Sequence, residues 1–122
     1  MKNKIIGISG LNIFDGFGEI FKTPSKAPEI VVRSIGINPD HTRTIVSQAT
    51  MLAPKYLLQI VREATKAFPN KCSDIVHGAV SVGVHIDPTI HISIVIAATE
   101  ASVYHFREIV AAANEARGLT RN

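Results

Sequence analysis

Hydrophobic and polar residues alternate along the stretch from residue 74 to residue 98, and this pattern organises the prediction. From Val76 to Ile86 the even positions, apart from Gly78, hold valine or isoleucine, whereas the odd positions hold small residues or histidine. Asp87-Pro88-Thr89 interrupts the pattern, and a second alternation begins at Ile90. Successive strand side chains point to opposite faces, and proline supplies no ladder donor. The pattern therefore predicts two strands joined as a hairpin.

A turn centred on Pro88 would fix which residues of this hairpin face each other. One face would be entirely aliphatic, and the other would carry two histidines near the turn and then small residues. A slip of one residue would expose the whole aliphatic row, so we expect this register. The predicted cross-strand pairs are His85 with His91, Gly83 with Ser93, and Ser81 with Val95.

The first half of the chain predicts a similar arrangement. Residues 29–37 are expected to form a strand, residues 38–40 a turn, and residues 42–51 the returning strand, which is rich in β-branched residues. A helix beginning near His41 is the alternative, because the apolar residues between 45 and 53 also fit a helical stripe. Pro54 suits the first turn of a new helix, so we favour a strand followed by a helix over residues 54–68.

The sequence also repeats itself. When it is shifted by 49 residues, ten of the 31 positions from Ile37 to Ala67 are identical, including Ile45-Val46 with Ile94-Val95. About two matches would be expected at average composition. An apolar stripe at helical spacing occurs both in residues 54–68 and in residues 102–116. The repeat is therefore interpreted as a duplicated hairpin and helix.

Together these patterns predict an α+β fold, (ββα)2, in a single domain of residues 1–122. Residues 1–28 would form an N-terminal strand or flap with a connector, residues 29–68 the first repeat, and residues 74–117 the second. The sheet would be mixed or antiparallel, with both helices on one face. Its other face is small and uncharged, so we expect a homo-oligomer that packs sheet against sheet.

Composition argues against several classes of protein. The net charge of +3 comes from scattered residues, and five phenylalanines and two tyrosines offer few stacking platforms, so no nucleic-acid partner is expected. No apolar run reaches the ~20 residues of a membrane helix, and no membrane partner is expected. A lone cysteine, Cys72, and the absence of a signal-peptide pattern favour the cytoplasm.

The candidate site lies on the small-residue face. His85 and His91, as cross-strand neighbours, could share a metal ion, although zinc sites need three or four ligands. Turn-end histidines that only pack and hydrogen-bond are the simpler interpretation. A small molecule could also lie on this face, in contact with His85, His91, Ser81, Ser93, Gly83 and Arg33. The sequence identifies no cofactor.

Three functions remain open at this point. The first is a small oligomeric module that binds a small molecule or a metal ion. The second is a cofactor-free enzyme with its site between subunits, in which His85 or His91 would move a proton. The third is a structural assembly subunit. No nucleophile, base and acid set identifies a reaction, so the sequence does not establish whether the protein is an enzyme.

The segment from Ile30 to Lys66, with its predicted hairpin turn, its threonine- and alanine-rich strand and the helix that follows, resembles a family of small uncharacterised bacterial proteins. The resemblance covers less than a third of the chain. It supports the predicted hairpin and helix but implies no activity.

Overall fold

The computed structural model describes residues 16–119, and this part of the chain consists of helices joined by short links, with no strand. Most links contain a single 3-10 turn that begins with proline. The α-helices are α2 (Phe17–Lys22), α3 (Ala27–Ile37), α4 (Thr42–Leu52), α5 (Leu57–Ala67), α6 (Cys72–Ile86), α7 (Ile90–Ala101) and α8 (Phe106–Ala116). The 3-10 turns are η1 (Pro24–Lys26), η2 (Pro39–His41), η3 (Pro54–Tyr56), η4 (Pro69–Lys71) and η5 (Val103–His105).

Helices α3, α4 and α5 end in the same way because the residue before the proline of each following link leaves the helical conformation. Asn38, Ala53 and Phe68 have φ values of −131°, −137° and −135°, as expected for a residue that would clash with the following proline ring in the α conformation. Each still donates its amide to the carbonyl four residues back, as Ala53 does to Ala49 at 2.8 Å. Each carbonyl then accepts the amide three residues ahead, which starts the 3-10 turn.

These links recur at a fixed spacing. Pro24, Pro39, Pro54 and Pro69 stand 15 residues apart. Helix α6 has 15 residues where α5 has 11, so the next proline, Pro88, comes four residues late. The true repeat is therefore one helix and one link. Three such repeats and the four extra residues of α6 account for the sequence offset of 49.

One isoleucine from each repeat builds the centre of the molecule. It lies six residues after the first residue of the link and is followed four residues later by alanine or serine on the same side of the helix. The large residue fills the core, and the small one lets a neighbouring helix approach closely. These isoleucines are Ile30, Ile45, Ile60, Ile75, Ile94 and Ile109, and each is 0% exposed.

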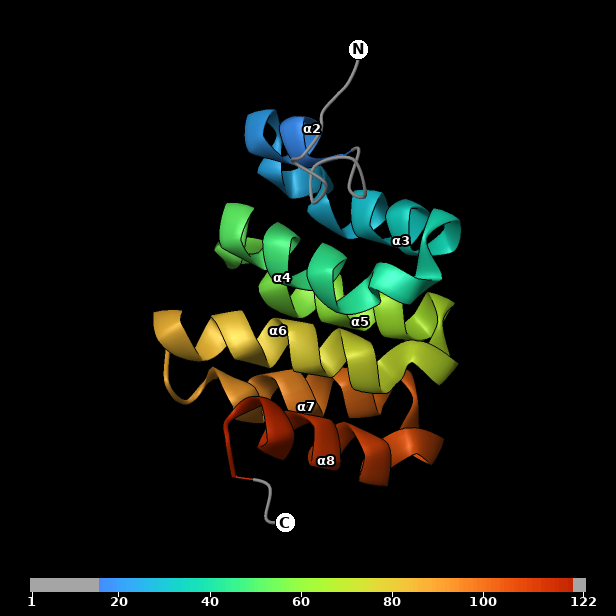
Figure 1. Cartoon of the computed structure of the whole chain (residues 1–122), viewed down its shortest axis with the longest axis vertical. Helices are drawn as coiled ribbons and strands as arrows, with labels where there is room; N and C mark the ends of the chain where they lie inside the picture. Colours follow the sequence, from blue (N-terminus) through green and yellow to red (C-terminus); the bar gives the residue numbers. More distant parts are fainter. Residues whose placement is uncertain (1–15, 120–122) are drawn as a thin grey trace.

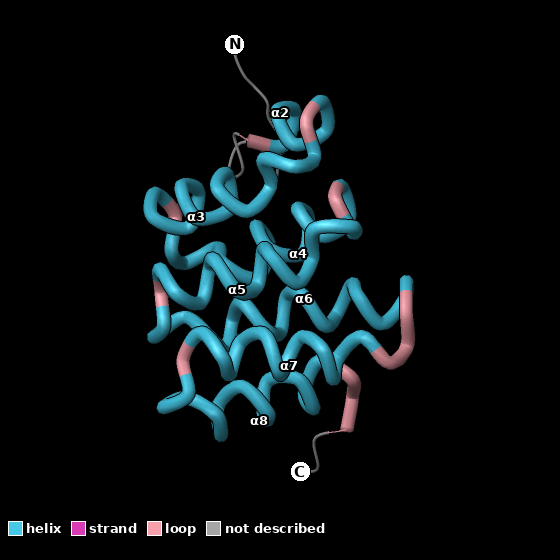
Figure 2. The backbone as a smooth tube through the Cα atoms, turned by 180° about the vertical axis from the view of Figure 1, so that it is seen from behind, coloured by secondary structure: helices cyan, strands magenta, loops and turns pink. Residues whose placement is uncertain are grey.

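The helices are arranged in two layers. Each of α3 to α6 packs more extensively against the helix two places ahead in the chain than against the next helix, so α4, α6 and α8 form one layer and α3, α5 and α7 the other. Figure 1 shows the first layer stacked in chain order, and Figure 2 shows the second from behind. The links alternate between the two sides of the stack, so each helix reverses the chain direction (Figure 2). This is the arrangement of a helical-repeat solenoid.

The predicted α+β fold is wrong, because the described residues form no sheet. The predicted strands 76–86 and 90–98 lie in α6 and α7, and strands 29–37 and 42–51 lie in α3 and α4. Helix α6 contacts α4, α5, α7 and α8. A helix covered on so many sides carries apolar residues around most of its circumference and loses the helical period. Its valines and isoleucines therefore simulate the alternation of a strand.

Two further expectations change with the sheet. The helix beginning near His41, the rejected alternative, is correct and is α4. The small-residue face for oligomerisation does not exist, so sheet-against-sheet packing is excluded, whereas a homo-oligomer as such stays a prediction. In the predicted N-terminal flap, residues 17–22 are helical, and residues 1–15 lie outside the described residues. The helices predicted over residues 54–68 and 102–116 are present as α5 and α8, which begin at Leu57 and Phe106.

The isoleucine column gives a direct test of the core. Replacing Ile75 by alanine should lower the free energy of unfolding by about 2–5 kcal/mol, because the lost methyl groups leave a cavity in a packed interior. Ile37→Ala is the matched control, since Ile37 is 66% exposed, and should change stability by less than about 0.5 kcal/mol. Urea unfolding followed by circular dichroism would measure both. Equal effects would contradict the column.

A second pair of variants tests how closely the helices approach. A Cβ at Gly78 would lie 2.7 Å from the carbonyl oxygen of Arg43, a backbone atom that cannot move aside alone. Gly78→Ala should therefore destabilise the protein by about 1–3 kcal/mol. At Gly36 the nearest atom would be the Phe68 ring at 3.6 Å. Gly36→Ala should stabilise by about 0.5–1 kcal/mol through helix propensity. Thermal unfolding should shift the two variants in opposite directions.

Candidate functional site

The two candidate metal ligands flank the turn between α6 and α7. His85 is exposed near the end of α6, and His91 lies in the first turn of α7 with its Nδ1 3.1 Å from the carbonyl oxygen of Pro88. The carboxylate of Asp87 accepts hydrogen bonds from the amide and hydroxyl of Thr89, both at 3.0 Å. Between residues 16 and 119, no three side chains of His, Cys, Asp or Glu are grouped to hold a metal ion. A two-histidine site stays a prediction.

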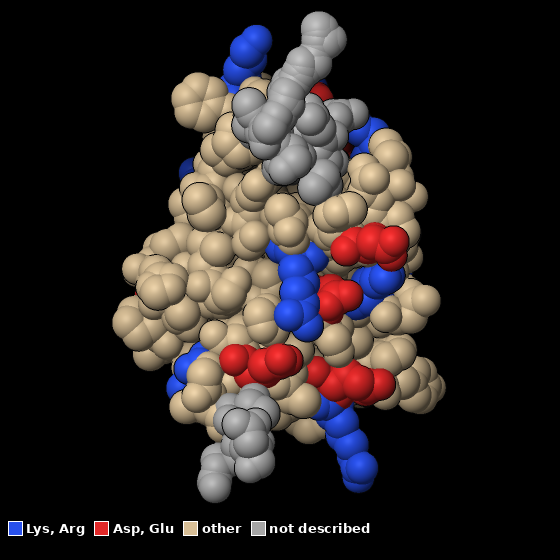
Figure 3. Space-filling view, in the orientation of Figure 1, with Lys and Arg blue, Asp and Glu red and all other residues tan. Residues whose placement is uncertain are grey.

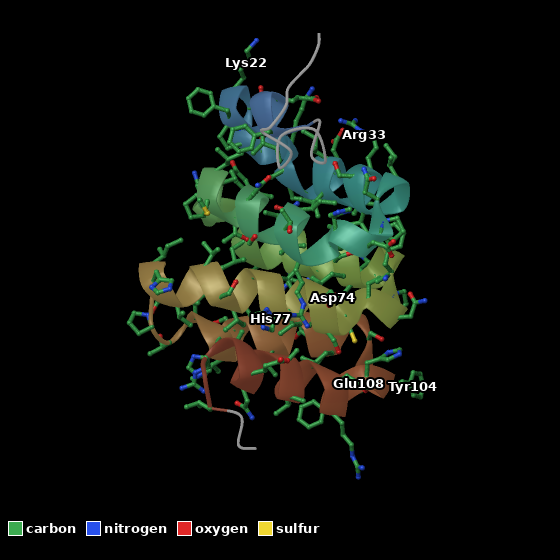
Figure 4. The ribbon with its side chains drawn as sticks, viewed as in Figure 1. Lys22, Arg33, Asp74, His77, Tyr104 and Glu108 are labelled. Atoms are coloured by element: carbon green, nitrogen blue, oxygen red, sulfur yellow. The ribbon has the colours of Figure 1, made fainter. Side chains whose placement is uncertain are left out.

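The other predicted ligand-binding residues do not form one site. Ser81 donates its hydroxyl to the carbonyl of Gly78 at 3.0 Å, within its own helix. Gly83 is buried, and a Cβ there would lie 2.9 Å from Ile90. Ser93 is half-buried on α7. Arg33 lies on α3, toward the opposite end of the stack (Figure 4), and pairs with Glu19 at 3.2 Å.

Concavities on the described surface do not bring catalytic groups together. One lies between α3 and α5 and is lined by residues that include Pro28, Val32 and Glu63. Another lies between α5 and α7, where Arg62 and Glu100 pair at 3.8 Å. Neither contains the predicted histidines or the cysteine.

On the face shown in Figure 3, acidic and basic side chains are intermixed, which is unlike the basic stripe of a nucleic-acid interface.

The only cysteine is a core residue. Cys72 begins α6 and is buried. Burial raises the pKa of its thiol, and the nearby carboxylate of Glu108 raises it further, against hydrogen bonds with Ser73 that lower it. Burial and a neighbouring negative charge both disfavour the thiolate, the form that reacts. Cys72 is therefore unsuited to nucleophilic chemistry.

The feature that stands out is the way the stack ends. Three positions of each repeat lie three, seven and eleven residues after the first residue of the link, on one side of the helix. In α3 to α6 all these positions are buried beneath the helices that follow. In α7 and α8 none of the corresponding residues is buried. We call these six residues the terminal face: His91, Val95, Thr99, Phe106, Val110 and Asn114.

Half of the terminal face is apolar, and other exposed apolar residues continue it. Phe106 is 51% exposed, whereas Cys72, at the same position of α6, is 2% exposed. Helix α7 adds a second row of apolar residues, each directly after a residue of the terminal face. This row consists of Ile92 and Ile96, which are 55% and 53% exposed. No Asp or Glu stands among the six positions. The terminal helices of a solenoid ordinarily carry a polar outer face, which keeps the end soluble.

One charged residue marks the edge of this face. Arg107 stands two residues before the core residue Ile109, as Arg43 stands two residues before Ile45. Arg43 donates from Nε to the Asp74 carboxylate of α6 at 2.9 Å. Among residues 16–119, by contrast, Arg107 has no acidic partner within ion-pair distance. The guanidinium that α4 uses to hold the next helix of its layer is thus unused on α8.

Helix α8 nevertheless ends with a proper stop. Gly118 stands where the next link would begin and has φ +77°. Its amide bonds to the Glu115 carbonyl at 3.0 Å, and the Leu119 amide bonds to the Asn114 carbonyl at 2.9 Å. This is the Schellman motif, which needs the left-handed conformation that glycine adopts freely. The helix is capped, but the face beside it is not covered.

Comparisons with known proteins supply no relative for this chain. No protein-family model, no curated protein and no solved structure matches it. Its function therefore has to be argued from its own residues. None of the helices in the described residues is both long and apolar enough to cross a membrane.

The terminal face was missed in the sequence, although a signal for it was present. Four prolines at a constant spacing of 15 residues define the repeat, and aligning the helices on them shows the same apolar positions in every helix. The isoleucine and the valine after it recur in α8 as Ile109 and Val110, so the sequence already indicated that α8 carries a residue of the kind that earlier helices bury.

The chemistry of Cys72 can be tested directly. The folded protein should react with Ellman's reagent at pH 8 at least about a hundredfold more slowly than unfolded protein in urea, because the thiol is buried and its raised pKa lowers the thiolate fraction. Because the pKa of the Cys72 thiol is higher in the folded than in the unfolded state, the free energy of unfolding should fall as pH rises through the folded-state pKa, above the ordinary range of a thiol. Rapid labelling of folded protein would contradict the burial.

Proposed function

We propose that this chain is a protein-docking module whose terminal face receives a helix from another protein. The observation that carries the proposal is that positions buried in α3 to α6 are only half-buried or exposed in α7 and α8. Val95 and Val110 repeat the valine that α3 to α6 bury at the same position, and Thr99 repeats the threonine that α4 and α5 bury. This develops the hypothesis of a structural assembly subunit. The contact surface is now the terminal face of the helical stack instead of the face of a sheet.

The energetics favour association at this end. Exposed valine, isoleucine and phenylalanine gain about 25 cal/mol for every Å² of apolar surface that a partner removes from water. A helix added to a solenoid needs no rearrangement of the helices already present, because each repeat contacts mainly its neighbours. The terminal face therefore offers a preformed site, which lowers the cost of ordering on binding.

Small-ligand binding and catalysis receive less support. The residues predicted to bind a ligand lie in three different helices and include Gly83, which is buried, and Arg33, which is paired. No observation in the described residues favours a particular reaction. An enzyme reading would require a cavity that combines a titratable group with a binding surface.

The proposal can be tested with a helix from the chain itself. Helix α6 packs on α4 as the partner helix would pack on α8, so the probe is a fluorescein-labelled peptide of residues 69–86 with Cys72→Ser and three added lysines for solubility. We expect saturable binding to the intact protein at micromolar concentrations, measured by fluorescence anisotropy. Val110→Asp in the protein should weaken it at least about tenfold, because an aspartate would be desolvated beneath the peptide.

The matched control is Val32→Asp, which introduces the same charge at a half-buried valine on α3, at the other end of the stack. It should bind the peptide as the unmodified protein does. If Val110→Asp does not fold by circular dichroism, Phe106→Ser replaces it, since Phe106 is largely exposed. The absence of binding by unmodified protein, or equal loss in both variants, would rule out docking at the terminal face.

A further inference from the structure

The described structure contains two examples of a helix bound in the way that the terminal face would bind one. In the layer of α4, α6 and α8, α6 packs on α4 and α8 packs on α6. In both cases the arriving helix carries an acidic residue followed four residues later by glycine or alanine. The pairs are Asp74 with Gly78 on α6, and Glu108 with Ala112 on α8.

Each member of this pair has a visible role in the first example. Asp74 accepts a hydrogen bond from Arg43 at 2.9 Å, and Figure 4 labels it on the face of α6. Gly78, one turn later, lies directly on the α4 backbone, where a Cβ would meet the Arg43 carbonyl at 2.7 Å and the Val46 side chain at 3.2 Å. The acid thus selects the cation, and the small residue allows the close approach.

The second example shows the same placement on a helix that lacks arginine. Ser73 takes the place of Arg43 on α6, and the charge of Glu108 still reaches this end of α6, where it contributes to the raised pKa of Cys72. Ala112 is 5% exposed, so the small residue again lies in the contact. The layer of α3, α5 and α7 differs, with Gln59 on α5 and Ser93 on α7 at the acidic position.

We infer that the partner helix carries an aspartate or glutamate followed four residues later by glycine or alanine, with the acid bound by Arg107 and the small residue seated on the backbone of α8. This inference rests on the proposed docking function and specifies its partner. The geometry follows from the equivalence of Arg107 and Val110 with Arg43 and Val46. Arg107 is exposed and unpaired in the described structure, so it is available for the contact.

A second copy of this chain fits the face less well. If two copies met through their terminal faces, neither would supply an acid, because the six positions include no Asp or Glu. At the other end of the described stack, α3 carries Glu29 at the acidic position, but the residue four places later is Arg33, which is large and paired with Glu19. Neither end of the described stack therefore offers the required pair of acid and small residue.

The test is a charge exchange between the protein and the peptide of residues 69–86. Arg107→Glu in the protein should weaken binding of the original peptide about fivefold or more, since an exposed ion pair contributes up to about 1 kcal/mol and reversal adds repulsion. The peptide with Asp74→Arg should bind the unmodified protein equally poorly. Combining Arg107→Glu with the Asp74→Arg peptide should recover most of the affinity.

A separate peptide variant tests the small residue. Gly78→Leu in the peptide should abolish binding measurable by anisotropy, because a large side chain cannot lie against the backbone of α8. Gly83→Leu in the peptide is the matched control. Gly83 lies on the side of α6 that faces Leu57, Ile90 and Ile94 rather than α4, so this peptide should bind as the original does.

The outcomes separate the inference from the docking function. If Val110→Asp removes binding but Arg107→Glu and Gly78→Leu leave it unchanged, docking stands and the inferred partner motif is wrong. If no peptide binds, docking itself fails. If analytical ultracentrifugation shows that the purified protein dimerises and that Val110→Asp makes it monomeric, the occupant is a second copy, and the inference of an acidic partner helix is overturned.

Discussion

The architecture depends on the backbone of the residue that precedes each link. Proline disfavours the helical conformation at that residue, so α3, α4 and α5 end at equivalent places and turn in the same way. Asn38, Ala53 and Phe68 share nearly the same φ and ψ although their side chains have nothing in common. Because the turns are alike, the helices between them become equivalent, and the isoleucines fall in register. Ser102 adopts a related conformation before Val103, which shows that the surrounding stack can hold the turn without a proline.

The sequence predicted part of this architecture and concealed the rest. The helices around Ile60 and Ile109 were evident because their apolar residues form one stripe with charged residues opposite, and the internal repeat was evident from identical residues. The repeat unit was mistaken, because the four extra residues of α6 shift the second half and the strongest match joins positions three helices apart. Helices α6 and α7 were read as strands for a physical reason. Both are apolar around most of their circumference, and periodicity then no longer distinguishes helix from strand.

The candidate site shows the same division between local pattern and tertiary context. His85 and His91 were correctly placed on either side of a turn around Pro88, but their facing arrangement depended on a sheet that is absent. Gly83 was expected to lie on a small-residue face, beneath a ligand. It is closely covered, but by Ile90 inside the helical core. The terminal face could not be seen without the repeat unit. Phe106 and Val110 look like ordinary core residues until they are aligned with Cys72 and Val76, which are buried, whereas Phe106 is exposed and Val110 is only half-buried.

The long helix α6 has a consequence for how such a chain can change in length. Its four additional residues amount to about one helical turn, or about 6 Å of rise, and they project Ile86 to the outside, where it is 55% exposed. Since the added length is close to a whole turn, the residues on either side keep their direction around the helix axis, and α7 still meets α5. Length variation in whole turns thus leaves the lateral contacts of the array intact. The overhanging tip is a place where insertions can accumulate without disturbing the interior.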